Sequence, residues 1–367
     1  MTSASHGTAA NKQPNFDVLR LLFAALVIFS HSFELVRLPD PIQARIGSVS
    51  PGQLAVDGFF LISGYLITRS WIADPSVRRF LARRVLRIYP AFIVASVLSV
   101  FVAGPLGAIP HQYFADLEVG RFLRGLLVLR DPQTPRVFAG TSIELVNGAM
   151  WTISFEFRCY LIAMVLGILG LFRQRYAVLA LTVIMGIAIC ATAPASGATD
   201  PQHILFGVKA LRVSDFMAWF ATLFMTGSSY ALFRDRIRFA PVLWLIALSL
   251  FVVSIAHADT LRLGVLIFGS YVVFGIANAP ALYGSNWLRH TDISYGLYLY
   301  GWPVQKLLEW YYPSLGPWSV CGLTLALAGS LAFVSWHLIE KNALKIKPRG
   351  FSGDGGRVRH MSPGQPT

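Results

Sequence analysis

A histidine and an arginine lie on the same face of the first long apolar segment. Arg20 and His31 are eleven residues apart, so a helix directs both to one side and separates them by roughly 16 Å along its axis. Ionisable groups are costly within a bilayer, and each is a candidate functional group. Histidine is the commonest general base, so His31 is a candidate base, and Arg20 is a second candidate functional group on the same face. The alternatives are snorkelling of Arg20 and a helix-packing hydrogen bond of His31.

Two carboxyl groups on other apolar segments are candidates to assist this histidine. Asp57 opens the second segment, and Glu156 lies near the start of the fourth. Both are predicted at the same end of the spans as His31, where either would orient the imidazole or raise its basicity. A simple interfacial carboxylate is the alternative for each.

Three arginines follow the second apolar segment. Arg83 and Arg87 are four residues apart, and Arg84 and Arg87 are three apart, so on a helix they form one cationic ridge. Guanidinium groups bind phosphate oxygens in pairs of hydrogen bonds, which makes the ridge a candidate clamp for the phosphates of a donor. A topology signal that also binds anionic lipid is the alternative.

Hydroxyl and aromatic side chains complete the candidate set. The hydroxyl groups of Ser63 and Tyr295 are candidate hydrogen-bond donors. They would stabilise the oxyanion that forms when a nucleophile attacks a carbonyl group. Trp302 ends an aromatic run, 293–303, whose rings point to several sides of a helix, as expected of burial among helices or of an interfacial belt. The three cysteines lie far apart without zinc spacing, so we predict no metal site.

These residues belong to a chain with the composition of a membrane protein. Its 367 residues are 55% hydrophobic and 13% charged, whereas soluble domains average about 25% charged residues. A helical span needs about 20 mostly apolar residues. The pattern predicts an all-α, polytopic transmembrane helix bundle of about ten spans: 16–36, 53–71, 88–109, 149–172, 176–194, 213–233, 240–257, 263–280, 293–312 and 317–340.

The basic residues predict the orientation of this bundle. Most of the 31 Lys and Arg fall in loops on the side shared by the two termini, which places both termini in the cytoplasm of a cell with an inner membrane. This distribution also accounts for the net charge of +13 without nucleic acid. We expect a cytoplasmic tail over 1–15, with no cleavable signal, a transmembrane domain over 16–341, and a basic, disordered cytoplasmic tail over 342–367.

Five motifs in order resemble the acyltransferase 3 family of membrane acyltransferases over nearly the whole chain. Phe157 stands where many members have a second glutamate, and Gly301 where many have a histidine. The matching stretches are Asp17-x-x-Arg20 with His31, which resembles the family's Arg-x10-His signature, then Phe59–Leu66, Arg83–Pro90, Trp151–Glu156 and Ile293–Pro303.

The resemblance implies transfer of an acyl group, usually acetyl from acetyl-CoA, to a hydroxyl of a cell-surface or exported glycan. The family's catalytic base then matches His31, and its required arginine matches Arg20. The donor is a substrate, so no bound cofactor is expected. The implied partners are acyl-CoA, the glycan acceptor, membrane lipid and proteins of polysaccharide assembly. Direct transfer and a relay through an acylated His31 both stay open.

Two other classes of protein fit the same apolar spans. A transporter or flippase would use the polar face of the first span as a path, although the spans show no obvious repeated halves. A scaffold subunit of a polysaccharide assembly complex would not need His31. Release of free CoA would distinguish an enzyme from a transporter or flippase. Loss of function on removal of His31 would distinguish an enzyme from a scaffold subunit.

Overall fold

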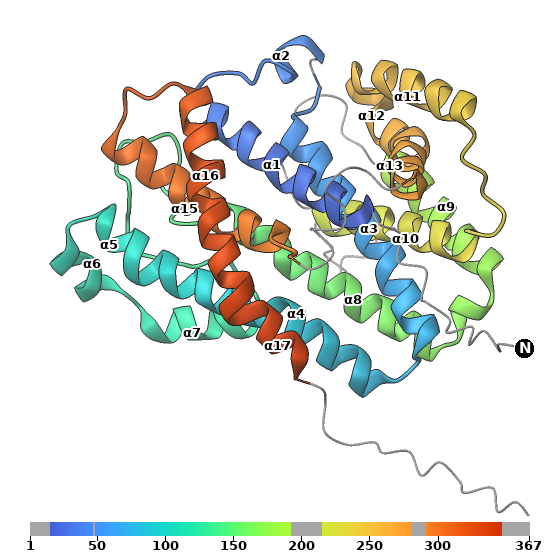
Figure 1. The fold of residues 1–367 in the computed structure, drawn as a ribbon, viewed down its shortest axis with the longest axis horizontal. Helices are drawn as coiled ribbons and strands as arrows, with labels where there is room; N and C mark the ends of the chain where they lie inside the picture. Colours follow the sequence, from blue (N-terminus) through green and yellow to red (C-terminus); the bar gives the residue numbers. More distant parts are fainter. Residues whose placement is uncertain (1–14, 47, 192–214, 281–290, 347–367) are drawn as a thin grey trace, which may run out of the picture.

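The computed structural model describes residues 15–46, 48–191, 215–280 and 291–346, and across these ranges every regular element is a helix (Figure 1). The predicted all-α class is therefore confirmed. Most of both predicted tails, the end of the fifth predicted span and the start of the sixth lie outside the described residues. The α-helices are α1 (Asn15–Leu35), α2 (Gln43–Ile46), α3 (Pro51–Ala73), α4 (Val77–Leu98), α5 (Gly104–Leu106), α6 (Pro110–Asp116), α7 (Val119–Leu127), α8 (Ile153–Ile168), α9 (Arg175–Ala191), α10 (Asp215–Leu232), α11 (Pro241–Ile255), α12 (Ala258–Gly264), α13 (Ser270–Asn278), α15 (Ser294–Tyr311), α16 (Pro317–Ser335) and α17 (Lys341–Lys345).

Five helical stretches of the described chain are long and apolar enough to cross a membrane, and α9 and α11 are shorter apolar helices. Each of the ten predicted spans overlaps a helix, while the number of crossings and the orientation stay predictions. Turns of π-helix extend three of the long stretches. The five stretches are Asn15–Leu35, Val77–Leu106, Gly148–Ile168, Ala258–Asn278 and Pro317–Lys345.

The third predicted span begins too late. Its helix starts at Val77 rather than at residue 88, because the arginines that lower the local hydropathy are good helix formers. The cationic ridge therefore lies on the first turns of α4 itself. A rigid helix, instead of a separate loop, positions all three guanidinium groups.

The centre of the bundle is α3, which packs against α10 on one side and α1 on the other. A Cβ atom added at Gly64 would overlap the carbonyl oxygen of Phe224, and one at Gly227 would overlap that of Leu61. The two backbones thus meet directly, as small residues permit between membrane helices. Gly64 therefore permits the close approach of α3 to α10.

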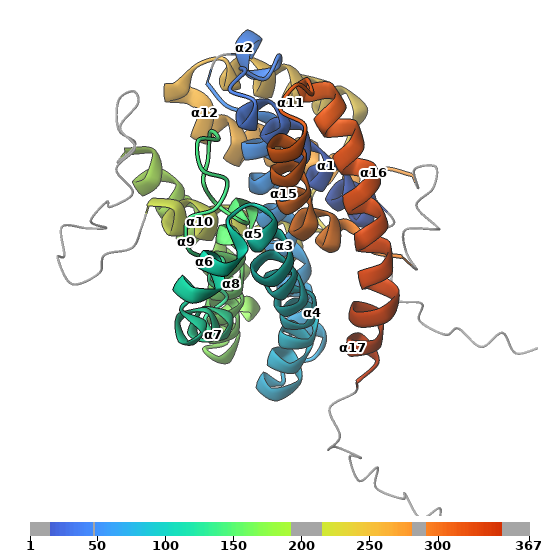
Figure 2. The same cartoon turned by 90° about the vertical axis from the view of Figure 1, so that its left-hand side faces the viewer.

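The bundle has two distinct ends. Figures 1 and 2 agree that α2 lies at one end and that α17 and the start of α4 lie at the other. We call these the α2 end and the α17 end. Because α1 and α3 run antiparallel between them, residues near the start of α1 and the finish of α3 share the α17 end.

A buried lysine fixes the irregular segment 128–147 to α15. Lys306 is fully buried, and its Nζ donates to Thr141 Oγ1 at 2.7 Å and to Glu309 Oε2 at 2.6 Å. Ser142 Oγ donates to the carbonyl oxygen of Leu35 at 2.8 Å, at the last residue of α1. The segment is thereby held over the α2 end of the bundle.

Replacing Lys306 with alanine is expected to destabilise the protein by about 3–5 kcal/mol, because Glu309 is left as an uncompensated, largely covered charge. The measurement is the midpoint of thermal unfolding of the purified protein in detergent. The double variant Lys306→Met, Glu309→Gln is the matched control and should recover most of the loss. Equal midpoints for the single variant and the wild type would refute this account of the segment.

Candidate active site

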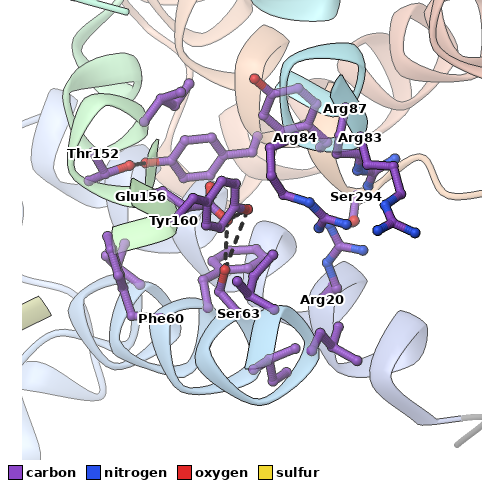
Figure 3. A pocket seen from close by; sticks show the side chains of 18 of the residues that line it. Arg20, Phe60, Ser63, Arg83, Arg84, Arg87, Thr152, Glu156, Tyr160 and Ser294 are labelled. Atoms are coloured by element: carbon purple, nitrogen blue, oxygen red, sulfur yellow. Dashed lines mark hydrogen bonds between the residues drawn. The ribbon is translucent and has the colours of Figure 1, made fainter. Parts of the chain in front are cut away.

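A cavity of about 360 Å³ lies at the α17 end, among α1, α3, α4, α8 and α15 (Figure 3). Arginines from two helices converge on it, one from α1 and three from the first turns of α4. The cavity therefore gathers the four arginines of the sequence prediction, together with three more predicted residues: Arg20, Arg83, Arg84 and Arg87, with Ser63, Glu156 and Tyr295.

An aspartate just before α15 holds two of these arginines. Asp292 Oδ2 accepts hydrogen bonds from Arg20 Nη1 at 2.9 Å and from Arg87 Nη2. Its other oxygen accepts from Ser294 Oγ at 2.6 Å, at the first residue of α15. Asp292 is not among the site residues predicted from the sequence. The available signal was its position as an acidic residue bordering an apolar segment on the side where arginines accumulate.

Arg83 and Arg84 differ in how far they are neutralised. Arg83 Nη2 donates to Asp74 Oδ2 at 3.0 Å. Arg84 Nη2 donates at 3.3 Å to the neutral hydroxyl of Ser70, and its guanidinium lies near the Tyr160 ring. Among the residues that the structure describes, no carboxylate forms an ion pair with Arg84, so it is the least compensated of the four cations.

Glu156 lies in the arginine-lined cavity. Ser63 Oγ donates to Glu156 Oε1 at 3.1 Å, and the Tyr160 hydroxyl donates to the same oxygen. The predicted contact between Glu156 and His31 is not formed. The reason is local: Tyr160 lies one turn further along α8 and, with Ser63, holds the carboxylate on the arginine side. A catalytic role for Glu156 stays a prediction.

His31 lies in a second cavity, of about 540 Å³, towards the α2 end. Its ring packs edge to face against Trp302, with centroids 4.8 Å apart and an interplanar angle of 84°. Trp302 Nε1 in turn donates to the carbonyl oxygen of Leu145 at 3.1 Å. No residue of the described chain forms a hydrogen bond with the imidazole, so packing against Trp302 positions it.

One wall separates the two cavities. Val56 and Tyr298 line both of them, and we call this pair the septum. The Tyr298 hydroxyl bonds to the carbonyl oxygen of Ala149 and to Thr152 Oγ1, each at 2.7 Å. Thr152 lines the first cavity and Ala149 the second. A tethered aromatic ring and a valine therefore stand between the arginine cavity and the histidine cavity.

The remaining predicted residues divide between these places. Asp57 is buried at 3% exposure and accepts a hydrogen bond from Trp219 Nε1 at 2.8 Å. It lines a third cavity and not that of His31, so the predicted support of the imidazole by Asp57 is not formed. Tyr295 donates its hydroxyl to the carbonyl oxygen of Ile88 at 3.2 Å and borders the arginine cavity.

The chain is similar to known proteins over most of its length. The chain is 28% identical to an O-acetyl transferase of Shigella phage Sf6, over 91% of this chain and 97% of that protein. It is 28% identical to nodulation protein 10 of Rhizobium leguminosarum bv. viciae, over 94% and 96% of the two chains. No solved structure matches the chain significantly. The model of the acyltransferase 3 family, described as an acyltransferase domain, matches residues 13–338, so the chain belongs to this family.

Proposed function

We propose that the protein transfers an acyl group from acyl-CoA to a hydroxyl of a cell-surface or exported glycan. Acetyl is the first candidate for this acyl group. The observation that carries the proposal is the pair of cavities on either side of the septum. One gathers four guanidinium groups, and the other contains His31. We call them the donor cavity and the acceptor cavity.

The charges of the donor cavity suit an anionic donor. Four arginines face one glutamate there, and guanidinium groups bind phosphate oxygens bidentately. Asp292 fixes the orientation of Arg20 and Arg87, while Arg84 keeps an uncompensated charge for the ligand. The flexible arm of CoA separates its phosphates from the thioester. Phosphates bound at the arginines therefore leave the acyl group free to approach the septum.

The reaction is then a transfer at the septum. His31 removes the proton from an acceptor hydroxyl, and the oxygen attacks the thioester carbonyl. The carbon–sulfur bond breaks, the acyl group forms an ester with the acceptor, and the CoA sulfur takes up the proton. In this scheme, Arg20 and Glu156 act from the donor side, because both line the cavity that we assign to the donor.

The membrane arrangement belongs to the same proposal. Ten crossings with both termini in the cytoplasm would direct the donor cavity to the cytoplasm, where CoA is made, and the acceptor cavity to the outer side of the inner membrane. The relatives support a transferase: one is named an O-acetyl transferase, and BcsY of Komagataeibacter xylinus, 23% identical over 92% of this chain and 85% of its own, carries the name of a membrane-bound transacylase.

Purified protein in lipid nanodiscs, mixed with acetyl-CoA and a neutral oligosaccharide, tests the proposal. We expect release of free CoA that depends on the oligosaccharide, and an alkali-labile mass increase of one acetyl group on the sugar. A transporter or flippase would produce neither signal. CoA release that does not depend on the sugar, with no ester formed, would contradict acyl transfer to a glycan.

Widening the septum is expected to change the preference for acyl-chain length. Tyr298→Ala removes the ring shared by the two cavities, so propionyl-CoA and butyryl-CoA should gain about tenfold relative to acetyl-CoA in kcat/KM, the scale of discrimination by a methylene in a fitted pocket. Tyr298→Phe keeps the ring and is the matched control. An active Tyr298→Ala variant with the wild-type preference would show that the acyl group does not pass the septum.

A further inference from the structure

A third cavity, of about 340 Å³, continues the acceptor cavity away from His31. The same three polar residues, Gln43, Ser50 and Gln53, line both. An aromatic contact also crosses the boundary, because Trp151 of the acceptor cavity packs edge to face on Phe216 of the third cavity at 4.9 Å. The acceptor cavity and the third cavity are therefore adjacent beneath α2, and we call the two together the groove, which extends from α1 to α12.

The third cavity is lined by side chains of the types that suit a sugar. Trp219 and Phe216 supply apolar ring surface, and Asp57, Asp215 and Gln53 supply acceptors and an amide. A few placed polar groups on an apolar, aromatic surface are typical of small-molecule sites. Sugar hydroxyls are donors, and carboxylates bind them with charge-assisted hydrogen bonds.

Two carboxylate oxygens along the groove lack a hydrogen-bond partner. They are Asp40 Oδ2, beside the acceptor cavity, and Asp215 Oδ1, beside the third cavity. Asp40 is 4% exposed, and its other oxygen accepts the backbone N–H groups of Ile42 and Gln43. Covered acceptors without donors are rare in folded proteins. Each of the two oxygens thus lacks a donor of the kind that a sugar hydroxyl supplies.

The charge of the groove opposes that of the donor cavity. Carboxylates line both of its parts, with Glu34 and Asp40 near His31 and Asp57 and Asp215 beyond. The arginine of the third cavity, Arg262, is engaged by Asp215 at 2.6 Å and by the carbonyl oxygen of Ile189 at 2.9 Å. Glu34, Asp40 and Asp57 form no ion pair among the residues that the structure describes. An acidic sugar would therefore meet repulsion from these carboxylates.

We infer that the acceptor is an extended, neutral glycan of at least two sugar residues. The sugar residue that is acylated lies beside His31, and a neighbouring sugar residue occupies the third cavity. This inference rests on the proposed acyl transfer, and it adds a second acceptor subsite and a charge preference to it.

The test compares a neutral monosaccharide glycoside with a neutral trisaccharide of the same sugar, using the full chain in nanodiscs with acetyl-CoA. The wild type should have a roughly tenfold lower KM for the trisaccharide. Phe216→Ala and Asp215→Asn should each remove most of that advantage and leave the KM for the monosaccharide unchanged. Tyr312→Ala, an exposed aromatic outside the groove, is the control and should behave as wild type.

Each contrary result has a distinct meaning. Equal KM values for the two acceptors in the wild type, or an undiminished trisaccharide advantage in both variants, would overturn the second subsite. Equal use of a trisaccharide that carries a uronic acid would overturn the preference for neutral sugars. Transfer to neither neutral acceptor would refute the proposed function itself, and with it this inference.

Discussion

The variant His31→Ala is expected to lose acyl transfer while remaining folded in the membrane. A positioned general base contributes ~10²–10⁴-fold to a rate, and the residues that the structure describes offer no second histidine in the acceptor cavity. The fold should persist because the imidazole makes one ring contact, with Trp302, and no hydrogen bond within the described chain. The measurements are acceptor-dependent CoA release and the unfolding midpoint in detergent.

His337→Ala is the matched control for this result. That histidine is half-buried and packs on Phe333, and it does not line the acceptor cavity, so the variant should retain wild-type transfer. Undiminished transfer by His31→Ala would place the base elsewhere. A scaffold subunit would not need His31 either, so loss of transfer in this variant also distinguishes an enzyme from a scaffold.

The variant Arg84→Met should raise the KM for acetyl-CoA by about 10- to 100-fold, with a smaller effect on kcat. The estimate corresponds to one charge-assisted hydrogen bond, about 1.5–3 kcal/mol. Among the four arginines of the donor cavity, Arg84 has the weakest compensation, so its loss should affect the ligand more than the fold. Steady-state kinetics at fixed ionic strength give the measurement, because phosphate contacts weaken with salt.

Arg78 supplies the control for this second variant. It lies on the same helix, is exposed and does not line the donor cavity, so Arg78→Met removes an equal charge without the contact. An unchanged KM in Arg84→Met would contradict donor binding in this cavity. Equal effects of the two variants would indicate general electrostatic attraction at the α17 end instead of a phosphate site.

The helical segments were predictable from the sequence because a bilayer demands long apolar helices, and each predicted span overlaps one. The start of α4 was not predictable from hydropathy. Val77 to Arg87 is charged, and its helical state follows from helix propensity and packing against Asp74 and Ser70. The convergence of Arg83, Arg84 and Arg87 was predictable, since it depends only on helical spacing.

The pairing between helices could not be predicted in this way. Asp292 reaches Arg20 and Arg87 because three helices far apart in sequence meet at the α17 end. Glu156 lies on the arginine side, and not beside His31, because the rotation of α8 depends on Tyr160 and Ser63. Helical spacing within one segment can be read from the sequence, whereas the depth and rotation that decide which cavity Glu156 lines depend on the neighbouring helices.

The septum also bears on the proton permeability of the membrane. In the proposed orientation, the two cavities approach each other through the bundle, and if water fills both, most of the membrane voltage would fall across the septum. One elementary charge crossing 100 mV gains about 2.3 kcal/mol, so protons would leak through any continuous water path. In that orientation, the ring of Tyr298, tethered at Ala149 and Thr152, would have to block proton leakage as well as border the site of transfer.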